Sequence, residues 1–290
     1  MRLLTDEDVL RFPRAQAILV MREAVLAAER GTLEAPARVH TGGLTFTAGG
    51  NARVFGFRAY PTRETPLEEQ LVAVWNAAGR VEAIVLGGAL GPLRTAALGA
   101  LATEVLAPPD AGRLGLIGSG VQAEAHALSV AAVRPLEQVL VYSPSAENRQ
   151  RLVGVLRAQG LPAEGAESAR EVCVRSNLLT LATNSSVSVI ETAWVQPGTH
   201  VCTLGPKEQE RHECPLGLAS AASLVVTDGL AQLGAYTGGH IFAGVEVLSL
   251  GSCLEHPPER SPEAITLFLS VGLAGTEVLL AEAMVEADLS

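Results

Sequence analysis

Apolar residues recur at helical spacing from Thr5 to Gly31 and at shorter, alternating spacing from about Arg38 to Leu86. The first stretch begins with Thr5-x-x-Asp8, which predicts a helix start with an acid near the positive end of the helix, and we expect helical structure to end at Gly31. The second stretch contains the strand-like pieces "LTFTAG", "RVFGFRAY", "EQLVAVWN" and "VEAIVLGG". The sequence "NAAGR" between the last two predicts a hairpin turn.

The pattern changes at Pro108-Pro109-Asp110, where we place a domain boundary. Before it, "GPLRTAALGALATEVLA" predicts a helix that opens after Pro92. After it, helical runs alternate with the short apolar strands "RLGLIG", "QVLVYS", "NLLTLAT", "THVCTLG" and "SLVVTD". This alternation predicts an α/β fold with a parallel sheet and right-handed crossovers.

The late segment "AITLFLSVGLAGTEVLL" is strongly apolar but is interrupted by two glycines and Glu277. It is too short for a membrane span, so it predicts a buried helix. From Ser261 we expect the chain to return and pack on the first domain.

The amino-acid composition indicates which kinds of binding partner are disfavoured. The 290 residues include 48% hydrophobic and 18% charged side chains, which is typical of a globular protein with room for two cores. A net charge of −10 and 4% aromatic residues disfavour nucleic acid and anionic membranes as partners. The acidic start "MRLLTDEDVL" does not resemble an export signal, and the four cysteines lack a CxxC pair, so we expect reduced thiols and a cytoplasmic location.

The stretch "GLIGSGVQAEAH" carries the clearest chemical signal. Gly118 and Gly120 lie between an apolar strand and a helix, and Ala123 takes the third position of a G-x-G-x-x-(G/A) pattern. The first glycine permits a tight turn, the second lets the backbone approach a pyrophosphate, and the third small residue lets the helix lie close to the strand. The pattern predicts a dinucleotide site, and a plain strand-turn-helix is the alternative.

The end of the next strand distinguishes NAD from NADP. An acid there would bind the adenosine ribose and disfavour a 2′-phosphate, but "YSPSAENR" offers Ser143, Ser145 and Arg149 instead. We therefore expect NAD or NADP as cofactor and favour NADP. The alternative is that these serines only cap the next helix.

Taken together, "LGPLRTAALGALA", "GLIGSGVQA", "LATNS", "GTHVCTLG" and "ITLFLSVGLA" resemble the ornithine cyclodeaminase/mu-crystallin family over nearly the whole chain. The resemblance implies a homodimer with a Rossmann-type NAD(P)-binding domain at 111–261. It also implies an α+β substrate and dimerisation domain at 1–110, completed by 262–290. The implied reaction is hydride transfer at the α-carbon of a small amino, imino or keto acid.

The resemblance also assigns residues. It places the substrate carboxylate near Arg38 and Arg94, and Val271 beside the substrate. A planar guanidinium suits this task, because it can hold a carboxylate through two hydrogen bonds. For Arg38 a solvated surface charge is the alternative. The residues expected at the cofactor are Thr95, Gly118, Gly120, Val121, Gln122, Ser143, Thr183, Leu204, Gly205 and Ser270.

Two positions depart from the family pattern. Arg58 stands where the family has a lysine that contacts the carboxylate and can move a proton, and arginine hardly ever releases its proton. Lys207 stands where the cyclodeaminase and alanine dehydrogenase branches have a catalytic aspartate. We keep Arg58 and Lys207 as the catalytic candidates, with Lys207 as an acid if burial lowers its pKa. The alternative for Lys207 is an exposed loop lysine beside Glu208 and Glu210.

The other chemical candidates have plainer interpretations. Asp228 ends a predicted strand and is interpreted as a helix cap, with a site role as the alternative. His126 is interpreted as a packing or surface residue. The His-x-Cys pairs that begin at His200 and His212 do not match a known structural zinc spacing, so we expect no metal.

The sequence thus favours NAD(P)H-dependent reduction of a small imino or keto acid. Ornithine cyclodeaminase is one alternative, and a non-catalytic NAD(P)-binding protein is the other.

Overall fold

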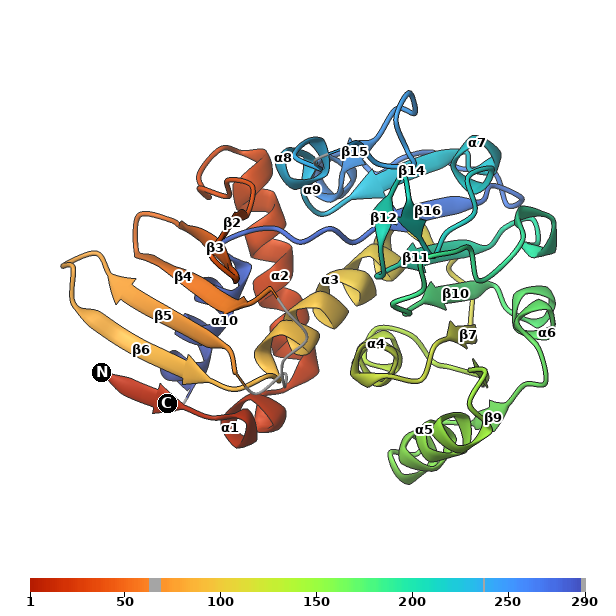
Figure 1. Ribbon diagram of the computed structural model, residues 1–290, viewed down its shortest axis with the longest axis horizontal. Helices are drawn as coiled ribbons and strands as arrows, with labels where there is room; N and C mark the ends of the chain where they lie inside the picture. The colour runs from red at the N-terminus through yellow and green to blue at the C-terminus, as the bar shows by residue number, and fades with distance from the viewer. Residues whose placement is uncertain (63–68, 237, 288–290) are drawn as a thin grey trace.

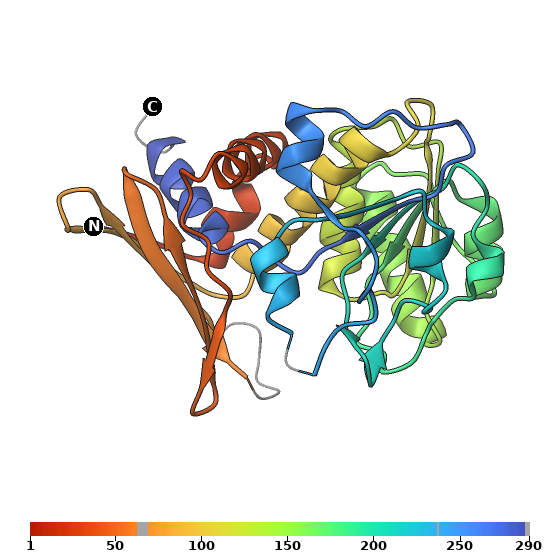
Figure 2. The same ribbon diagram turned by 90° about the horizontal axis from the view of Figure 1, so that it is seen from above.

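A computed structural model describes residues 1–62, 69–236 and 238–287 of the chain (Figure 1). A six-stranded sheet and an eight-stranded sheet lie at opposite ends of the molecule, with helices between them (Figure 2). Helix α10 (Thr276–Ala287) packs on the six-stranded sheet, α2 (Arg14–Glu29) packs against both α10 and α3 (Leu90–Leu106), and α3 lies along α4 (Val121–Ala131).

The six-stranded sheet has the order β1-β6-β5-β4-β3-β2, with β1 parallel to β6 and every other pair antiparallel. The four predicted strands are present, and the predicted turn is confirmed by a hydrogen bond from the Asn76 amide to the Arg80 carbonyl at 3.0 Å. The strands are β1 (Arg2–Leu4), β2 (Val39–Thr41), β3 (Leu44–Gly50), β4 (Val54–Pro61), β5 (Leu71–Asn76) and β6 (Val81–Leu86).

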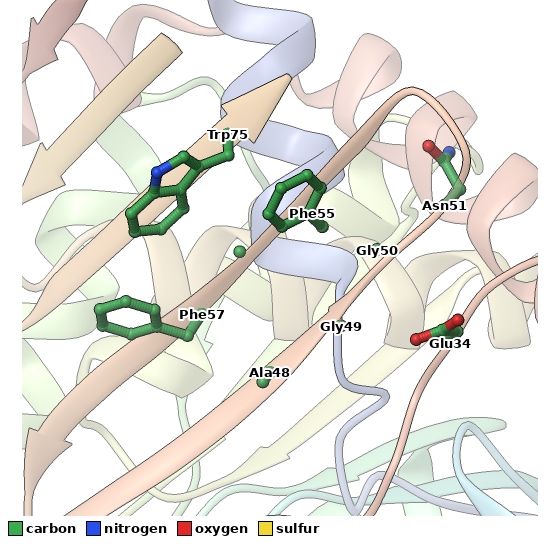
Figure 3. A pocket seen from close by; sticks show the side chains of 9 residues that line it. Glu34, Ala48, Gly49, Gly50, Asn51, Phe55, Phe57 and Trp75 are labelled. Atoms are coloured by element: carbon green, nitrogen blue, oxygen red, sulfur yellow. The ribbon is translucent and has the colours of Figure 1, made fainter. Parts of the chain in front are cut away.

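The two faces of this sheet differ. Alternate residues of a strand point to opposite faces, so Gly56 and Arg58 face α10 while Phe55 and Phe57 face outward. Outside, the Phe55 ring stacks on Trp75 with 6.3 Å between ring centroids. Figure 3 shows these aromatic rings beside Gly49 and Gly50, where they line an outer hollow of about 540 Å³.

The predicted N-terminal helix is two helices. The capping box at its start is present, since the Asp8 carboxylate accepts the Thr5 amide at 2.8 Å, but α1 (Asp6–Arg11) ends before Pro13 and α2 begins after it. Proline has no amide hydrogen and disfavours helical backbone at Phe12, which is extended here. The predicted end at Gly31 is confirmed by its left-handed backbone, with φ of 69°.

Helix α3 begins at Leu90, three residues earlier than predicted. Pro92 is its third residue, a position where the missing amide hydrogen has no partner to lose. Nearly all of α3 is buried, which suits a helix between two layers.

The eight-stranded sheet is entirely parallel, with the order β15-β14-β16-β11-β10-β7-β8-β9. The order β9-β8-β7-β10-β11 is that of a Rossmann fold, so the predicted fold class is confirmed. All five predicted strands are present, and three were not predicted. The strands are β7 (Arg113–Ile117), β8 (Gln138–Tyr142), β9 (Ala163–Gly165), β10 (Leu178–Leu181), β11 (His200–Thr203), β14 (Leu224–Thr227), β15 (Leu248–Ser249) and β16 (Thr266–Leu269).

The remaining elements are short or lie on the flanks of this sheet (Figure 1). They are α5 (Ala146–Ala158), α6 (Ala169–Arg175), η1 (Thr192–Trp194), β12 (Lys207–Glu208), β13 (Arg211–His212), α7 (Leu218–Ala221), α8 (Leu230–Gly234) and α9 (Leu250–Glu255).

The buried helix predicted for the late segment is wrong in its first half. Strand β16 lies there, inserted between β11 and β14, and only α10 is helical. A continuous apolar run fits a central strand as well as a buried helix, and Gly272 and Gly275 separate the two elements with left-handed backbone. Strand β16 belongs to the eight-stranded sheet, and the chain reaches α10 only after it. The domain limits 1–110, 111–261 and 262–290 stay predictions.

Candidate functional site

A cleft of about 1120 Å³ opens where the chain leaves the carboxyl ends of β7, β8, β10 and β11. Ligands of open parallel sheets bind at such a reversal of strand order. Gly118 forms its turn with φ of 119°, and a Cβ there would lie 2.2 Å from the Ala182 carbonyl oxygen. A side chain is therefore excluded on steric grounds, as the glycine pattern predicts.

Most of the predicted cofactor residues line this cleft. Two do not: Thr95 lies on α3, and Ser270 is buried at the end of β16. The Ser270 amide donates to the Thr203 carbonyl at 3.1 Å, next to the cleft wall at Leu204. The predicted residues in the lining are Gly118, Gly120, Val121, Gln122, Ser143, Thr183, Leu204 and Gly205.

A buried carboxylate that the sequence analysis missed organises one wall of the cleft. Glu213 is fully buried and accepts hydrogen bonds from the Thr183 amide and hydroxyl, both at 2.8 Å, and from the Thr203 hydroxyl at 2.7 Å. It also accepts the Gly205 amide. One side chain thus joins the loops after β10 and β11, and no local sequence signal marks it.

The far end of the cleft has polar and cationic groups beside β8. Ser145 is the cap of α5, accepting the Asn148 amide at 3.2 Å, so the cap interpretation is confirmed for this serine. Ser143 instead lines the cleft, and Arg149 donates to its carbonyl at 3.1 Å. Arg170 on α6 is the one charged side chain in the described lining, and the sequence analysis missed it.

The predicted arginines converge on the inner side of the six-stranded sheet. Arg58 donates to the Glu277 carboxylate at 2.9 Å, and Arg94 donates to the same oxygen at 2.6 Å. Glu277, from α10, was not predicted as a partner. Burial alone would raise the pKa of Glu277, but the charges of Arg94 and Arg58 outweigh it and lower this pKa from 4.5 to about 2. The two guanidiniums therefore have an internal counter-ion.

Arg38, just before β2, reaches the same place. It donates to the Val271 carbonyl, while its Nε atom is buried without a partner. A Cβ on Gly272 would lie 3.4 Å from Arg38 Nη2 and 3.5 Å from Arg94 Nη1, so both guanidiniums border this glycine. Arg38 is thus not a solvated surface charge. A cavity of about 30 Å³ lies here, lined by Arg38, Thr47, Arg58, Tyr60, Arg94, Gln232, Gly272, Leu273, Ala274 and Glu277.

Asp228 holds the loop 270–272, of which Gly272 lines the arginine cavity. Its carboxylate accepts the Val271 amide at 2.8 Å, the Gly272 amide at 3.0 Å and the Ser270 hydroxyl at 3.3 Å. The helix-cap interpretation is wrong, because α8 begins after Gly229 and the Asp228 side chain turns toward β16 instead. Burial raises the pKa of Asp228, partly offset by these amide hydrogen bonds. Asp228 fixes the loop 270–272 between the two sites.

Lys207 is fully buried, so the exposed-loop alternative is wrong. Its ammonium donates to the Gly205 carbonyl at 2.7 Å. Burial lowers the pKa of Lys207, and the charges of Glu213 and Asp228 act in the opposite direction. Lys207 does not belong to the described lining of either the cleft or the arginine cavity.

The two buried histidines have packing partners. His126 bonds to Thr180 at 3.0 Å and contacts Gly99 of α3, which confirms the packing interpretation. His200 bonds to Thr266 at 2.8 Å, and burial lowers the pKa of both rings, to about 4 for His126 and about 3 for His200. Among the described residues no His, Cys, Asp and Glu side chains group as metal ligands. No helix in the described part of the chain has the length and apolarity to cross a membrane.

Comparison with known proteins agrees with this geometry. A model of the ornithine cyclodeaminase/mu-crystallin family matches residues 70–289. The chain belongs to the ornithine cyclodeaminase/mu-crystallin family. The resemblance inferred from the motifs is thereby confirmed.

Two relatives of this family member are named as reductases. It is 30% identical to a Δ1-pyrroline-2-carboxylate reductase of Bacillus cereus over 72% of this chain and 67% of that protein. It is 31% identical to the iminosuccinate reductase of Paracoccus denitrificans over the same shares. The structure of that iminosuccinate reductase with NAD⁺ gives a TM-score of 0.88 at 24% identity, covering 99% of this chain and 95% of that chain. This structural similarity, at 24% identity, shows that the two proteins share a fold.

Proposed function

We propose that this protein reduces a small imino or keto acid with a reduced nicotinamide dinucleotide. The observation that carries the proposal is the loop 270–272, whose Ser270 amide bonds to the Thr203 carbonyl next to the glycine-loop cleft and whose Gly272 lines the arginine cavity. The cleft fits a dinucleotide, because Gly118 and Gly120 leave the backbone open to a pyrophosphate, and Glu213 fixes the opposite wall. The relatives named as reductases support the same reaction.

In this proposal the protein mainly binds the substrate and the cofactor and positions them relative to each other. The bound cofactor would supply the hydride. Arg38 and Arg94 would hold the substrate carboxylate at Gly272, and this would fix the α-carbon relative to the cofactor cleft. Arg58 would help to hold Arg94 through the shared Glu277 carboxylate. Thr95 and Ser270 stay predicted cofactor contacts, Val271 a predicted substrate contact, and Arg58 and Lys207 predicted catalytic residues.

The experiment is turnover by the purified protein. NADPH or NADH is supplied with a panel of cyclic imino acids, or of 2-keto acids plus ammonia, and loss of the reduced nicotinamide is followed. We expect turnover with at least one small imino acid and formation of the amino acid. Ammonia and proline from ornithine would instead identify a cyclodeaminase, which Arg58 and the buried Lys207 disfavour. Nucleotide binding with neither reaction would identify a binding protein.

We infer NADPH as the preferred nucleotide. Ser143 offers a hydroxyl at the tip of β8, Arg170 in the same lining offers a guanidinium, and the described lining contains no acid to repel a 2′-phosphate. Replacing Arg170 by alanine should weaken NADPH binding by about 10- to 100-fold and leave NADH binding unchanged, measured by calorimetry.

Arg175→Ala is the matched control for Arg170, because Arg175 lies on the same helix but its guanidinium is already paired with Glu164 at 2.7 Å and Glu171 at 2.6 Å. It should leave both affinities unchanged. Equal loss of NADH and NADPH binding in Arg170→Ala would argue against a 2′-phosphate site.

We propose a homodimer formed through the outer face of the six-stranded sheet. Phe55 is 47% exposed and stacks on Trp75 beside the hollow in Figure 3, so an apolar patch faces water in the single chain. Phe55→Lys should yield a monomer in analytical ultracentrifugation. Val174→Lys, at 49% exposure on α6, should leave the assembly unchanged. A wild-type monomer would contradict this interface.

We also propose a cytoplasmic location. All four cysteines are buried as free thiols, and burial raises the pKa of the Cys173 thiol from 9.0 to about 12. Unpaired cysteines are typical of a reducing compartment.

A further inference from the structure

Reduction of a neutral imine requires a proton donor as well as a hydride donor, because the nitrogen must gain a proton as the C=N bond becomes a single bond. The inference below rests on the proposed function and concerns the source of that proton. The motif resemblance implies a proton-transfer lysine at position 58 and, in the cyclodeaminase and alanine dehydrogenase branches, an aspartate at position 207. This chain has Arg58 and Lys207 there.

The charged groups that line the arginine cavity are unsuited to donate a proton to the substrate. Arg38, Arg58 and Arg94 are guanidiniums, which hardly ever release a proton. Glu277 has its pKa lowered to about 2, so at neutral pH it is a carboxylate without a proton to give. Lys207 lies outside the described lining of the cavity and donates to the Gly205 carbonyl.

Tyr60 remains, and it lies where a donor is needed. It is two residues from Arg58 on β4, so both side chains are on the inner face of the sheet. The Arg58 guanidinium lies over the Tyr60 ring, 4.5 Å from its centroid. Tyr60 lines the arginine cavity together with Arg94, which the proposed function places at the substrate carboxylate.

The surroundings of Tyr60 also suit the phenolate that forms when its hydroxyl gives up a proton. When a phenol gives up its proton it turns into a phenolate, and the Arg58 guanidinium over the Tyr60 ring places a positive charge beside that group. Tyr60 is only partly buried, so water can restore its proton after each turnover.

We propose that Tyr60 is the proton donor to the substrate nitrogen. In this step the Tyr60 O–H bond breaks and an N–H bond forms on the substrate. The C=N bond becomes a single bond as the α-carbon receives the hydride that reduced nicotinamide supplies, and the nicotinamide is oxidised. Water then reprotonates the phenolate.

The test compares two substrates on the variant Tyr60→Phe. A cyclic imino acid such as pyrroline-2-carboxylate needs the proton, whereas its N-methyl iminium analogue already carries a positive charge and needs none. Tyr60→Phe should lose about 10²- to 10⁴-fold in kcat on the imine and keep the wild-type kcat on the iminium. Tyr60→His, which retains a donor, should recover part of the lost rate on the imine.

Binding provides the readout that does not depend on turnover. Pyrrole-2-carboxylate, a planar carboxylate that cannot be reduced in this way, should bind Tyr60→Phe with wild-type affinity in calorimetry. Equal losses on imine and iminium, or weaker binding of pyrrole-2-carboxylate, would assign Tyr60 a packing role and overturn the proposal. Full activity of Tyr60→Phe on the imine would also overturn it. If the wild-type protein reduces neither substrate, it is the proposed function that fails, and this inference fails with it.

Discussion

Replacing Gly118 by alanine is expected to weaken binding of NADPH and NADH by about 100-fold. The added methyl group would lie 2.2 Å from the Ala182 carbonyl oxygen, and φ of 119° is strained for any residue with a Cβ. The glycine loop must then move away from β10, which changes the backbone position at which a pyrophosphate would bind. Calorimetric titration with each nucleotide measures the effect, and a thermal melt reports whether the variant is folded.

Gly154→Ala is the control for Gly118. Gly154 lies in the interior of α5, and a Cβ there would meet nothing within 4 Å. Alanine favours helix, so this variant should be as stable as the wild type or slightly more stable, with unchanged nucleotide affinity. Wild-type nucleotide affinity in a folded Gly118→Ala protein would contradict the assignment of the cleft.

Replacing Glu277 by glutamine is expected to lower the free energy of unfolding by about 3–5 kcal/mol. Glu277 is the acid that Arg58 and Arg94 share, and its removal leaves two guanidiniums with little compensation in a mostly buried site. Urea unfolding at neutral pH measures this loss. Glu286→Gln is the control, because Glu286 is exposed, pairs with the exposed Arg53 at 3.6 Å and should change stability by less than about 0.5 kcal/mol.

The pH dependence of stability follows from the same group. The pKa of Glu277 is lower in the folded protein, about 2, than its ordinary value of 4.5. The contribution of Glu277 to the free energy of unfolding is therefore fully present above about pH 4.5 and is lost as the pH falls toward 2. Glu277→Gln should lose less stability than the wild type over this interval. Identical acid unfolding curves for the two proteins would contradict the shared ion pair.

The fold was largely predictable because its signals are local. The strands of the parallel sheet are short apolar runs bounded by turn residues, and the glycine loop places its three small residues within one turn and one helix start. Prediction failed where local signals compete. The apolar run at 264–269 fits a strand or a helix equally well, and only its place between β11 and β14 decides for a strand.

The site was predictable only in part, because its partners are far apart in the sequence. Motifs identified Arg58 and Arg94, but Glu277 follows Arg94 by 183 residues, and nothing near it signals an ion pair. Asp228 likewise binds amides of a loop more than 40 residues later. Tyr60 is meaningful only when the pairing of β3 with β4 and the position of α10 place it beside the arginines.

Calorimetric titration of the wild-type protein with NADPH, NADP⁺, NADH and NAD⁺ tests the coenzyme site directly. We expect one nucleotide per chain, with NADPH the tightest and a Kd below about 1 mM. Failure of all four nucleotides to bind would contradict a coenzyme site between Gly118 and Gly205.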